Sequence, residues 1–131
     1  MDRRTFLTTG VAAGSAAAFG AEAQAENKIK IVGVSCSPRK GKTTSTGIQA
    51  ALDAAATADP RIATELIDLG GMVINGWAGG AKPGAAKEIA DDYAAKVEPA
   101  LTAPNLGGLI IGSPVYFRSL SSLCKAFLER L

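Results

Sequence analysis

A loop rich in hydroxyl groups and positive charges follows the first apolar run of the chain. Residues 33–45 read Gly-Val-Ser-Cys-Ser-Pro-Arg-Lys-Gly-Lys-Thr-Thr-Ser. The side chains that could bind an anion there are Ser35, Ser37, Arg39, Lys40, Lys42, Thr43, Thr44 and Ser45. They surround the start of an expected helix, whose first N–H groups and dipole already favour negative charge. The pattern predicts a phosphate-binding loop; the alternative is a solvated loop whose Ser and Thr only cap the helix.

The end of this loop, Gly41-Lys42-Thr43, also imitates a nucleotide-binding P-loop. That motif needs a glycine where this chain has Cys36, and Pro38 removes an N–H donor from the turn. No aspartate ends the third expected strand to hold magnesium. A nucleotide-binding NTPase is therefore the less favoured interpretation.

A second loop with the character of a ligand site follows the third expected strand. Residues 112–119 read Gly-Ser-Pro-Val-Tyr-Phe-Arg-Ser. The residues expected to contact a flat ring are Pro114, Val115, Tyr116 and Phe117. Aromatic side chains on a rigid turn offer apolar and backbone contacts to such a ring. The alternative places Tyr116 and Phe117 in the core, but an aromatic pair opposite a phosphate loop favours the ligand role.

Three strand–helix units are expected to position the two loops. Short apolar runs predict strands at 28–34, 62–69 and 107–112. Helices are expected from a cap at Thr43, Thr44 or Ser45 to Asp59-Pro60, from about Ala85 with an end or kink at Pro99, and over 119–131. Their expected buried residues are Ile48, Leu52, Ala55 and Ala56, then Ile89, Tyr93 and Val97, then Leu120, Leu123, Phe127 and Leu131.

The order β-α-β-α-β-α predicts an α/β fold class: a flavodoxin-like, doubly wound parallel sheet with strand order 2-1-3 and helices on both faces. In such a sheet the two loops meet at the carboxyl edge, between strands one and three. Three strands make an incomplete sheet, and the chain ends within an expected helix. We therefore expect a truncated chain that lacks the last strands.

The composition excludes several kinds of site. The chain has no His, which excludes histidine bases, ligands and catalytic triads within it. Cys36 and Cys124 are too few for a thiolate cluster and are expected to be free packing thiols, with a reactive Cys36 as the alternative. The net charge is +2 with scattered Lys and Arg, so no nucleic-acid surface is expected. Neither a metal site nor a catalytic side chain is predicted.

Residues 1–25 have the features of an export signal. Arg-Arg-Thr-Phe-Leu at 3–7 resembles the twin-arginine signal, a weakly apolar run extends to Phe19, and Ala-Gln-Ala at 23–25 is a cleavage site. The run is too short to span a bilayer, so no stable membrane insertion is expected. The alternatives are an ordinary secretory signal and an uncleaved anchor. We expect a signal peptide at 1–25, one domain at 26–131, and a periplasmic location.

Together the two loops resemble those of the flavodoxin-like NADPH-dependent FMN reductases and the related iron-sulfur flavoproteins. The family pattern G-x-S-x-S-P-R-K-G-x-(N/T)-T is matched at 33–44, and G-S-P-V-Y-F with a following K-A-F at 112–117 and 125–127. The resemblance covers 29–131 and implies FMN as the cofactor. It implies that the phosphate is bound by Ser37, Arg39, Thr43 and Thr44, and that the isoalloxazine is lined by Pro114, Val115, Tyr116 and Phe117.

Two departures from the family pattern matter. The loop at 75–82 lacks the cysteine cluster of the iron-sulfur members, so no such cluster is expected. Thr43 also stands where Asn is commoner.

The implied function is an exported FMN-dependent oxidoreductase in which the flavin performs the chemistry. Because nicotinamide cofactors are cytoplasmic, NADPH, a quinone and a redox protein all stay open as redox partners. A flavin electron-transfer protein without its own substrate is the alternative beside the nucleotide-binding one, and a homo-oligomer is compatible with the sequence.

Overall fold

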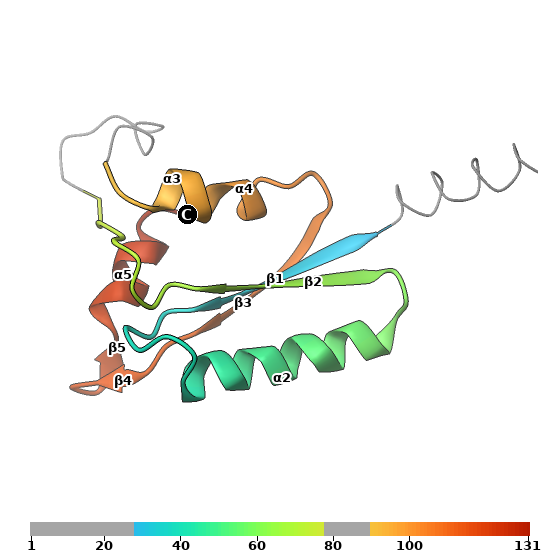
Figure 1. The fold of residues 1–131 in the computed structure, drawn as a ribbon, viewed down its shortest axis with the longest axis horizontal. Coiled ribbons are helices and arrows are strands. Elements are labelled where there is room, and N and C mark those ends of the chain that lie inside the picture. Colours follow the sequence, from blue (N-terminus) through green and yellow to red (C-terminus); the bar gives the residue numbers. More distant parts are fainter. Residues whose placement is uncertain (1–27, 78–89) are drawn as a thin grey trace, which may run out of the picture.

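The computed structural model describes residues 28–77 and 90–131, in which three parallel strands form the central sheet (Figure 1). The strands are β1 (Ile29–Ser35), β2 (Ile62–Asp68) and β3 (Leu106–Gly112). They lie in the order β2-β1-β3, which confirms the predicted topology and fold class. Ser35 of β1 pairs with Asp68 on one side and with Gly112 on the other. All three strands therefore end at one edge of the sheet.

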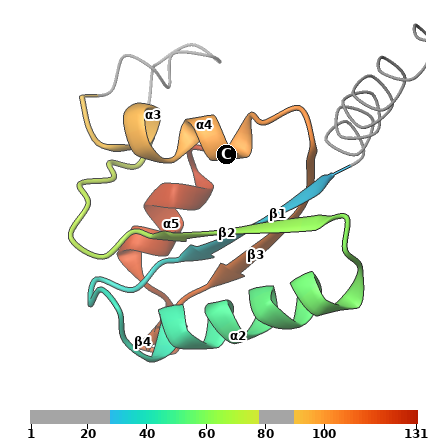
Figure 2. The ribbon, with the colours of Figure 1, turned by 45° about the vertical axis from the view of Figure 1, so that its right-hand side comes forward.

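Helices cover both faces of this sheet (Figures 1 and 2). The helix α2 (Thr43–Ala58) lies along one face. The opposite face carries α3 (Tyr93–Lys96), α4 (Glu98–Leu101) and α5 (Ser122–Leu128). A small antiparallel hairpin of β4 (Val115–Tyr116) and β5 (Ser119–Leu120) separates β3 from α5.

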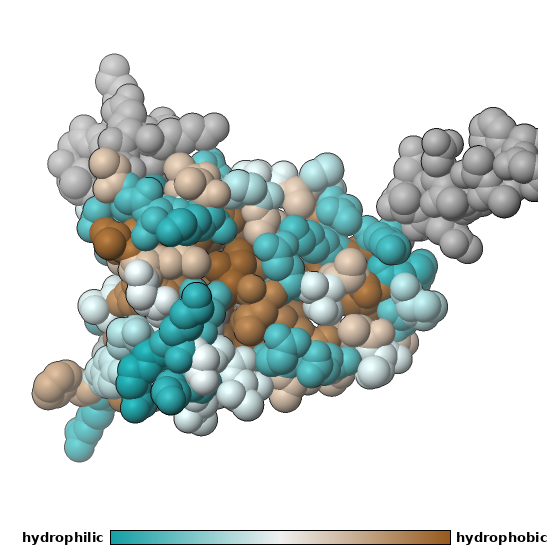
Figure 3. All heavy atoms as spheres, viewed as in Figure 1, coloured by the Kyte–Doolittle hydropathy of each residue, from teal (hydrophilic) through white to brown (hydrophobic). Residues whose placement is uncertain are grey.

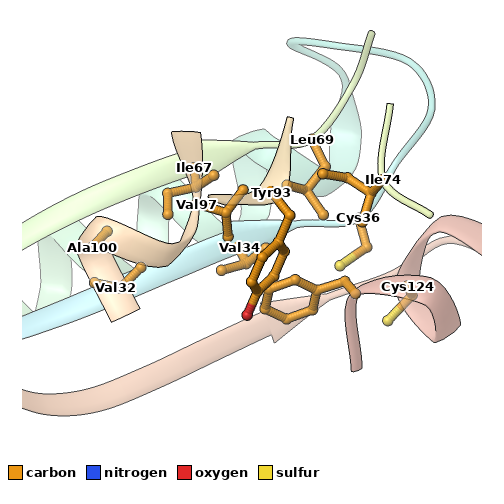
Figure 4. Packing of buried hydrophobic residues seen from close by; sticks show 11 residues of the cluster. Val32, Val34, Cys36, Ile67, Leu69, Ile74, Tyr93, Val97, Ala100 and Cys124 are labelled. Atoms are coloured by element: carbon orange, nitrogen blue, oxygen red, sulfur yellow. The ribbon is translucent and has the colours of Figure 1, made fainter. Parts of the chain in front are cut away.

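The alternation of side chains along β1 explains why two different faces can be covered. Val32 and Val34 are fully buried and point into the apolar cluster under α3, α4 and α5 (Figure 4). Between them, Gly33 faces α2, where Ile48 and Leu52 pack directly against its backbone. A β-branched strand with a glycine at one position thus allows α2 to approach the sheet closely.

The helix α2 matches its expected length but not its expected cap. Its N-cap is Lys42, and no side chain among residues 28–77 and 90–131 caps the helix. Thr43 is already helical, and the hydroxyl of Ser45 donates to the carbonyl of Lys42 at 2.8 Å instead. The prediction that Thr43, Thr44 or Ser45 caps the helix was therefore wrong.

The predicted apolar face of α2 is narrower than expected. Ile48 and Leu52 are buried and Ala55 is partly buried, as predicted, whereas Ala56 is exposed. The helix ends at its C-cap Asp59, as predicted.

The second helical region is two short helices within the described residues. Val97 ends α3, and Pro99 stands in the first turn of α4, where a missing N–H costs no hydrogen bond. Tyr93 and Val97 are buried, as predicted. The expected helix start near Ala85 and the residue Ile89 lie outside the described residues.

The prediction of one helix over 119–131 was wrong at both ends. Ser119 and Leu120 belong to β5, and α5 ends at Leu128 rather than continuing to the last residue. Leu120 and Leu131 are 45% and 61% exposed, so neither is a core residue. Leu123 packs against the core from a partly buried position, and Phe127 is fully buried.

A buried ion pair ties the end of α5 to the segments beside β2. The Arg130 guanidinium lies 2.6 Å from the Asp91 carboxylate, and both side chains are inaccessible to solvent. Burial favours the neutral acid, but donors from Asn75, Arg130 and Tyr93 outweigh it and hold the pKa of Asp91 below its ordinary value. The carboxylate therefore stabilises the fold above its unfolded-state pKa of about 4, and this contribution is lost as the pH falls through the lower folded-state value.

Asp91→Asn is expected to lower the free energy of unfolding by about 3 kcal/mol at pH 7, because it leaves the Arg130 charge buried without its carboxylate. Urea unfolding at pH 7 and pH 3 measures this loss. The gap between wild type and variant should narrow at pH 3, below the unfolded-state pKa of about 4, because the unfolded wild-type carboxylate then takes up a proton that the folded one resists. The exposed Asp53→Asn serves as control, and a gap that is equal at both pH values would contradict the prediction.

Gly33→Ala is expected to cost about 1–3 kcal/mol, since its Cβ would overlap Ile48 and lie 2.8 Å from Cδ1 of Leu52. Gly47 offers the matched control, because it lies within α2 with open space around it. Gly47→Ala should stabilise the protein by up to about 1 kcal/mol. Thermal unfolding of both variants tests the pair; equal shifts in Tm would refute the close packing of α2 on β1.

Candidate functional site

The loop from β1 to α2 brings the predicted phosphate-binding residues to the carboxyl edge of the sheet. Ser35 and Ser37 are buried, Thr44 is half-buried, and Arg39, Lys40 and Thr43 are exposed. Hydrophilic residues gather on the surface over this loop (Figure 3). A Cβ on Gly112 would lie 3.2 Å from Cγ2 of Thr44, so Thr44 lies against the end of β3. The loop therefore has buried serine hydroxyls on its inner side and exposed cations on its outer surface.

The N-terminus of α2 is open to an anion. The first N–H that bonds back within the helix is that of Thr46, which donates to the carbonyl of Lys42 at 3.0 Å. The preceding N–H groups, on Thr43, Thr44 and Ser45, have no intrahelical partner by the geometry of a helix start. No side chain of the described residues caps the helix, and the dipole of sixteen residues lies behind these groups, so they are available to an anion.

Two of the earlier N–H groups of the loop donate to acceptors within the protein. The Arg39 N–H donates to Oγ of Ser37 at 3.2 Å, and the Gly41 N–H donates to Oδ2 of Asp68 at 2.8 Å. These bonds shape the turn but remove its donors from a ligand. An anion at the helix start would lie within reach of the cations of the loop.

Ser35 carries a buried hydroxyl without a hydrogen-bond partner among the described residues. It is fully buried at the end of β1 and lies on the same side of the strand as Gly33, which faces α2. An unpaired buried hydroxyl costs about 1–3 kcal/mol, so it marks a polar group in need of a partner. A phosphate oxygen, or a water held by one, is a partner of suitable chemistry on the α2 side of the sheet.

The second predicted loop is the β4–β5 hairpin, which projects from the body of the molecule (Figures 1 and 3). Its turn residues Phe117 and Arg118 both have left-handed backbone, with φ of 48° and 63°. Phe117 is fully exposed, Val115 and Tyr116 are exposed, and Pro114 is half-buried. The alternative that Tyr116 and Phe117 are core residues is therefore wrong.

A hollow of about 540 Å³ opens beside the hairpin. It is lined by Tyr116, Phe117, Ser119, Leu120, Ser122 and Lys125. Its aromatic, aliphatic and cationic groups suit a flat, partly polar ligand.

The two loops meet, as the sheet topology predicts, and Ser121 joins them. Its hydroxyl donates to the carbonyl of Cys36 at 2.8 Å and accepts the N–H of Cys124 at 3.0 Å, which caps α5. Its own N–H donates to Oγ of Ser113 at 3.0 Å. The N–H of Cys36 in turn donates to the carbonyl of Gly112 at 2.8 Å. Ser121 is not among the predicted site residues, although a serine three residues before Cys124 and next to an apolar periodic run is a typical N-cap.

Cys36 and Cys124 are free, fully buried thiols of the core, as predicted (Figure 4). Burial raises the pKa of the Cys36 thiol, and neighbouring Cys124 raises it further. A raised pKa suppresses the reactive thiolate, so the alternative of a reactive Cys36 is not supported.

Both loops lie at the carboxyl edge of the sheet, on either side of the topological switch point between β1 and β3. A comparison with protein families identifies the family of the chain. The model of the family described as NADPH-dependent FMN reductase matches residues 29–131. The chain belongs to this family. FMN is the cofactor of its members, and NAD(P)H is their electron donor. No curated protein matches the chain.

The residues present fit FMN. The ligand's phosphate is a dianion, which matches the open helix start, the unpartnered Ser35 hydroxyl and the cations at positions 39, 40 and 42. The hairpin aromatics lie at the same edge for a ring system. In the described part of the chain, no group of three or more His, Cys, Asp and Glu could hold a metal ion, and none of its helices has the length and hydropathy to cross a bilayer.

Ser35→Ala separates a ligand contact from a folding role. Removal of an unpartnered buried hydroxyl should leave the free energy of unfolding of the ligand-free protein unchanged or raise it by about 1 kcal/mol. FMN affinity should fall in the same variant, about fivefold or more for a lost hydrogen bond. Urea unfolding and a fluorescence titration with FMN measure the two effects. Unchanged FMN affinity would remove Ser35 from the site.

Proposed function

We propose that this protein is an exported FMN-dependent oxidoreductase that binds the flavin across the β1–α2 loop and the β4–β5 hairpin. The observation that carries the proposal is the open N-terminus of α2, ringed by hydroxyls and three cations, in a chain of the NADPH-dependent FMN reductase family. FMN, when bound, supplies the hydride- and electron-transfer chemistry. The protein supplies binding, orientation and electrostatics.

The phosphate end of the site is assigned to Ser35, Ser37, Arg39, Lys40, Thr43 and Thr44. N–H groups of Thr43 and Thr44 would donate to the phosphate, and exposed Arg39 and Lys40 would neutralise its charge. Ser37 is already fixed by the N–H of Arg39, which leaves its own hydroxyl proton free to donate to the ligand.

The ring end of the site is assigned to Pro114, Val115, Tyr116 and Phe117. Exposed aromatic side chains at the carboxyl edge of β3 supply a flat apolar contact surface. The hairpin base is fixed by Ser113 and Ser121 rather than by a large core, so its aromatic residues are presented to ligand instead of being packed away.

NAD(P)H is the electron donor of the family. For this chain we propose NADPH, a quinone or a redox protein as the redox partner. The twin-arginine motif at 3–7 supports a periplasmic location and residues 1–25 as the signal peptide. The motif and the signal peptide lie outside the described residues. Because that compartment lacks a nicotinamide pool, the same motif favours a second candidate function, electron transfer between proteins without a separate substrate.

Arg39→Ala is expected to weaken FMN binding by about ten- to a hundredfold, because a charge-assisted contact to phosphate is lost. Riboflavin, which has no phosphate, should bind both forms equally. Arg61 provides the matched control, since it lies at the amino end of β2 and pairs with Asp59.

Flavin fluorescence titrations of the three proteins decide this test. If Arg61→Ala weakens FMN binding as much as Arg39→Ala does, the loss reflects net charge and the site is misplaced. A visible spectrum of the purified full chain, followed by addition of NADPH, separates the two candidate functions. Bleaching of the flavin bands supports the oxidoreductase, and bands that persist support the electron-transfer protein.

A further inference from the structure

The carboxylate of Asp68, at the carboxyl end of β2, holds the phosphate loop from the side. Its Oδ2 accepts the N–H of Gly41 at 2.8 Å, across 27 positions of sequence, and its Oδ1 accepts the N–H of Gly70 at 3.1 Å. Gly41 has left-handed backbone, with φ of 66°, and stands two residues before the first residue of α2. Asp68 therefore fixes the turn from which the helix starts.

The backbone around Asp68 is itself rigidly held. The N–H of Leu69 donates to the carbonyl of Ser35 at 3.0 Å, and the Leu69 side chain is fully buried. A Cβ on Gly70 would lie 2.6 Å from both N and Cα of Lys40, so the two backbones are in direct contact. The end of β2 thus determines the backbone positions of residues 40 and 41.

Electrostatics alone would argue against a carboxylate at this place. A negative charge beside an anion site repels a phosphate and lowers its affinity. Among the described residues, the Asp68 carboxylate accepts hydrogen bonds from two backbone N–H groups rather than pairing with a cation. It therefore acts through the direction of these bonds and not through its charge. These two bonds fix the conformation of the loop.

We propose that Asp68 is a positioning residue of the cofactor site: it binds the Gly41 N–H and thereby presents Arg39, Lys40 and the α2 N-terminus to the ligand phosphate. The proposal rests on the proposed function, because it takes the FMN phosphate as the ligand of that helix end. It predicts that loss of a negative charge near the phosphate weakens binding, the opposite of the electrostatic expectation.

The test compares FMN and riboflavin affinities of the full chain by fluorescence titration. Asp68→Ala should raise the Kd for FMN roughly 10- to 100-fold and leave the Kd for riboflavin unchanged, as for a lost hydrogen bond to a charged group. Asp68→Asn keeps one acceptor oxygen, so its Kd for FMN should lie between those of wild type and Asp68→Ala. Gly70→Ala should also weaken FMN binding alone, since it displaces Lys40 without any change of charge.

Asp53→Ala, which removes the same charge from an exposed position of α2, should leave both affinities unchanged. FMN binding by Asp68→Ala that is equal to or tighter than wild type would overturn the proposal. Equal loss of FMN and riboflavin would also overturn it, because that result reports general unfolding. If the wild type binds no FMN, the proposed function fails. Hydrogen exchange at the Gly41 amide then tests whether Asp68 fixes the loop. A faster exchange rate in Asp68→Ala supports the positioning role, and an unchanged rate refutes it.

Discussion

The parallel alignment of β2, β1 and β3 is the constraint on which the rest of the structure depends. Because all three strands run the same way, every connection that leaves a carboxyl end emerges at one edge. The central position of β1 places its loop between the ends of both neighbours. Asp68 of one neighbour and Gly112 of the other can therefore bond to the same short segment, residues 36–41. The site is built from segments distant in sequence because the sheet gathers their ends.

Polar groups rather than apolar packing determine the conformation of that edge. Each loop is fastened by one small side chain with two or more backbone partners: Asp68 on the β2 side and Ser121 on the β3 side. Such bonds are short-ranged and directional, so they fix backbone positions without filling the space a ligand needs. The apolar cluster under α3, α4 and α5 supplies the stability, and these few bonds supply the shape.

The strands, their order and the position of the β1–α2 loop were predictable because each depends on local sequence. β-Branched runs, a Pro-Gly-containing loop and an amphipathic stretch identify β1, its loop and α2, and the two-loop pattern identified the family. The hairpin was not predictable, because a two-residue turn normally carries Asn or Gly and this one carries Phe117 and Arg118. Without that indication, residues 119–121 were read as the first turn of a helix. The role of Asp68 depends on a contact across 27 positions, which no local pattern contains.

The left-handed turn at Phe117 and Arg118 is energetically unfavourable for residues with a Cβ, at about 1–2 kcal/mol each. A protein selected for stability alone would have Asn-Gly there, which adopts the same backbone without strain. The hairpin instead keeps a large aromatic ring at its most exposed point, where packing against the described residues does not offset the cost. Natural variation at these two positions would then show whether a homologue favours the stability of the hairpin or an exposed aromatic ring. Homologues that carry Asn-Gly at the turn would lack the exposed ring that Phe117 presents at the carboxyl edge of the sheet.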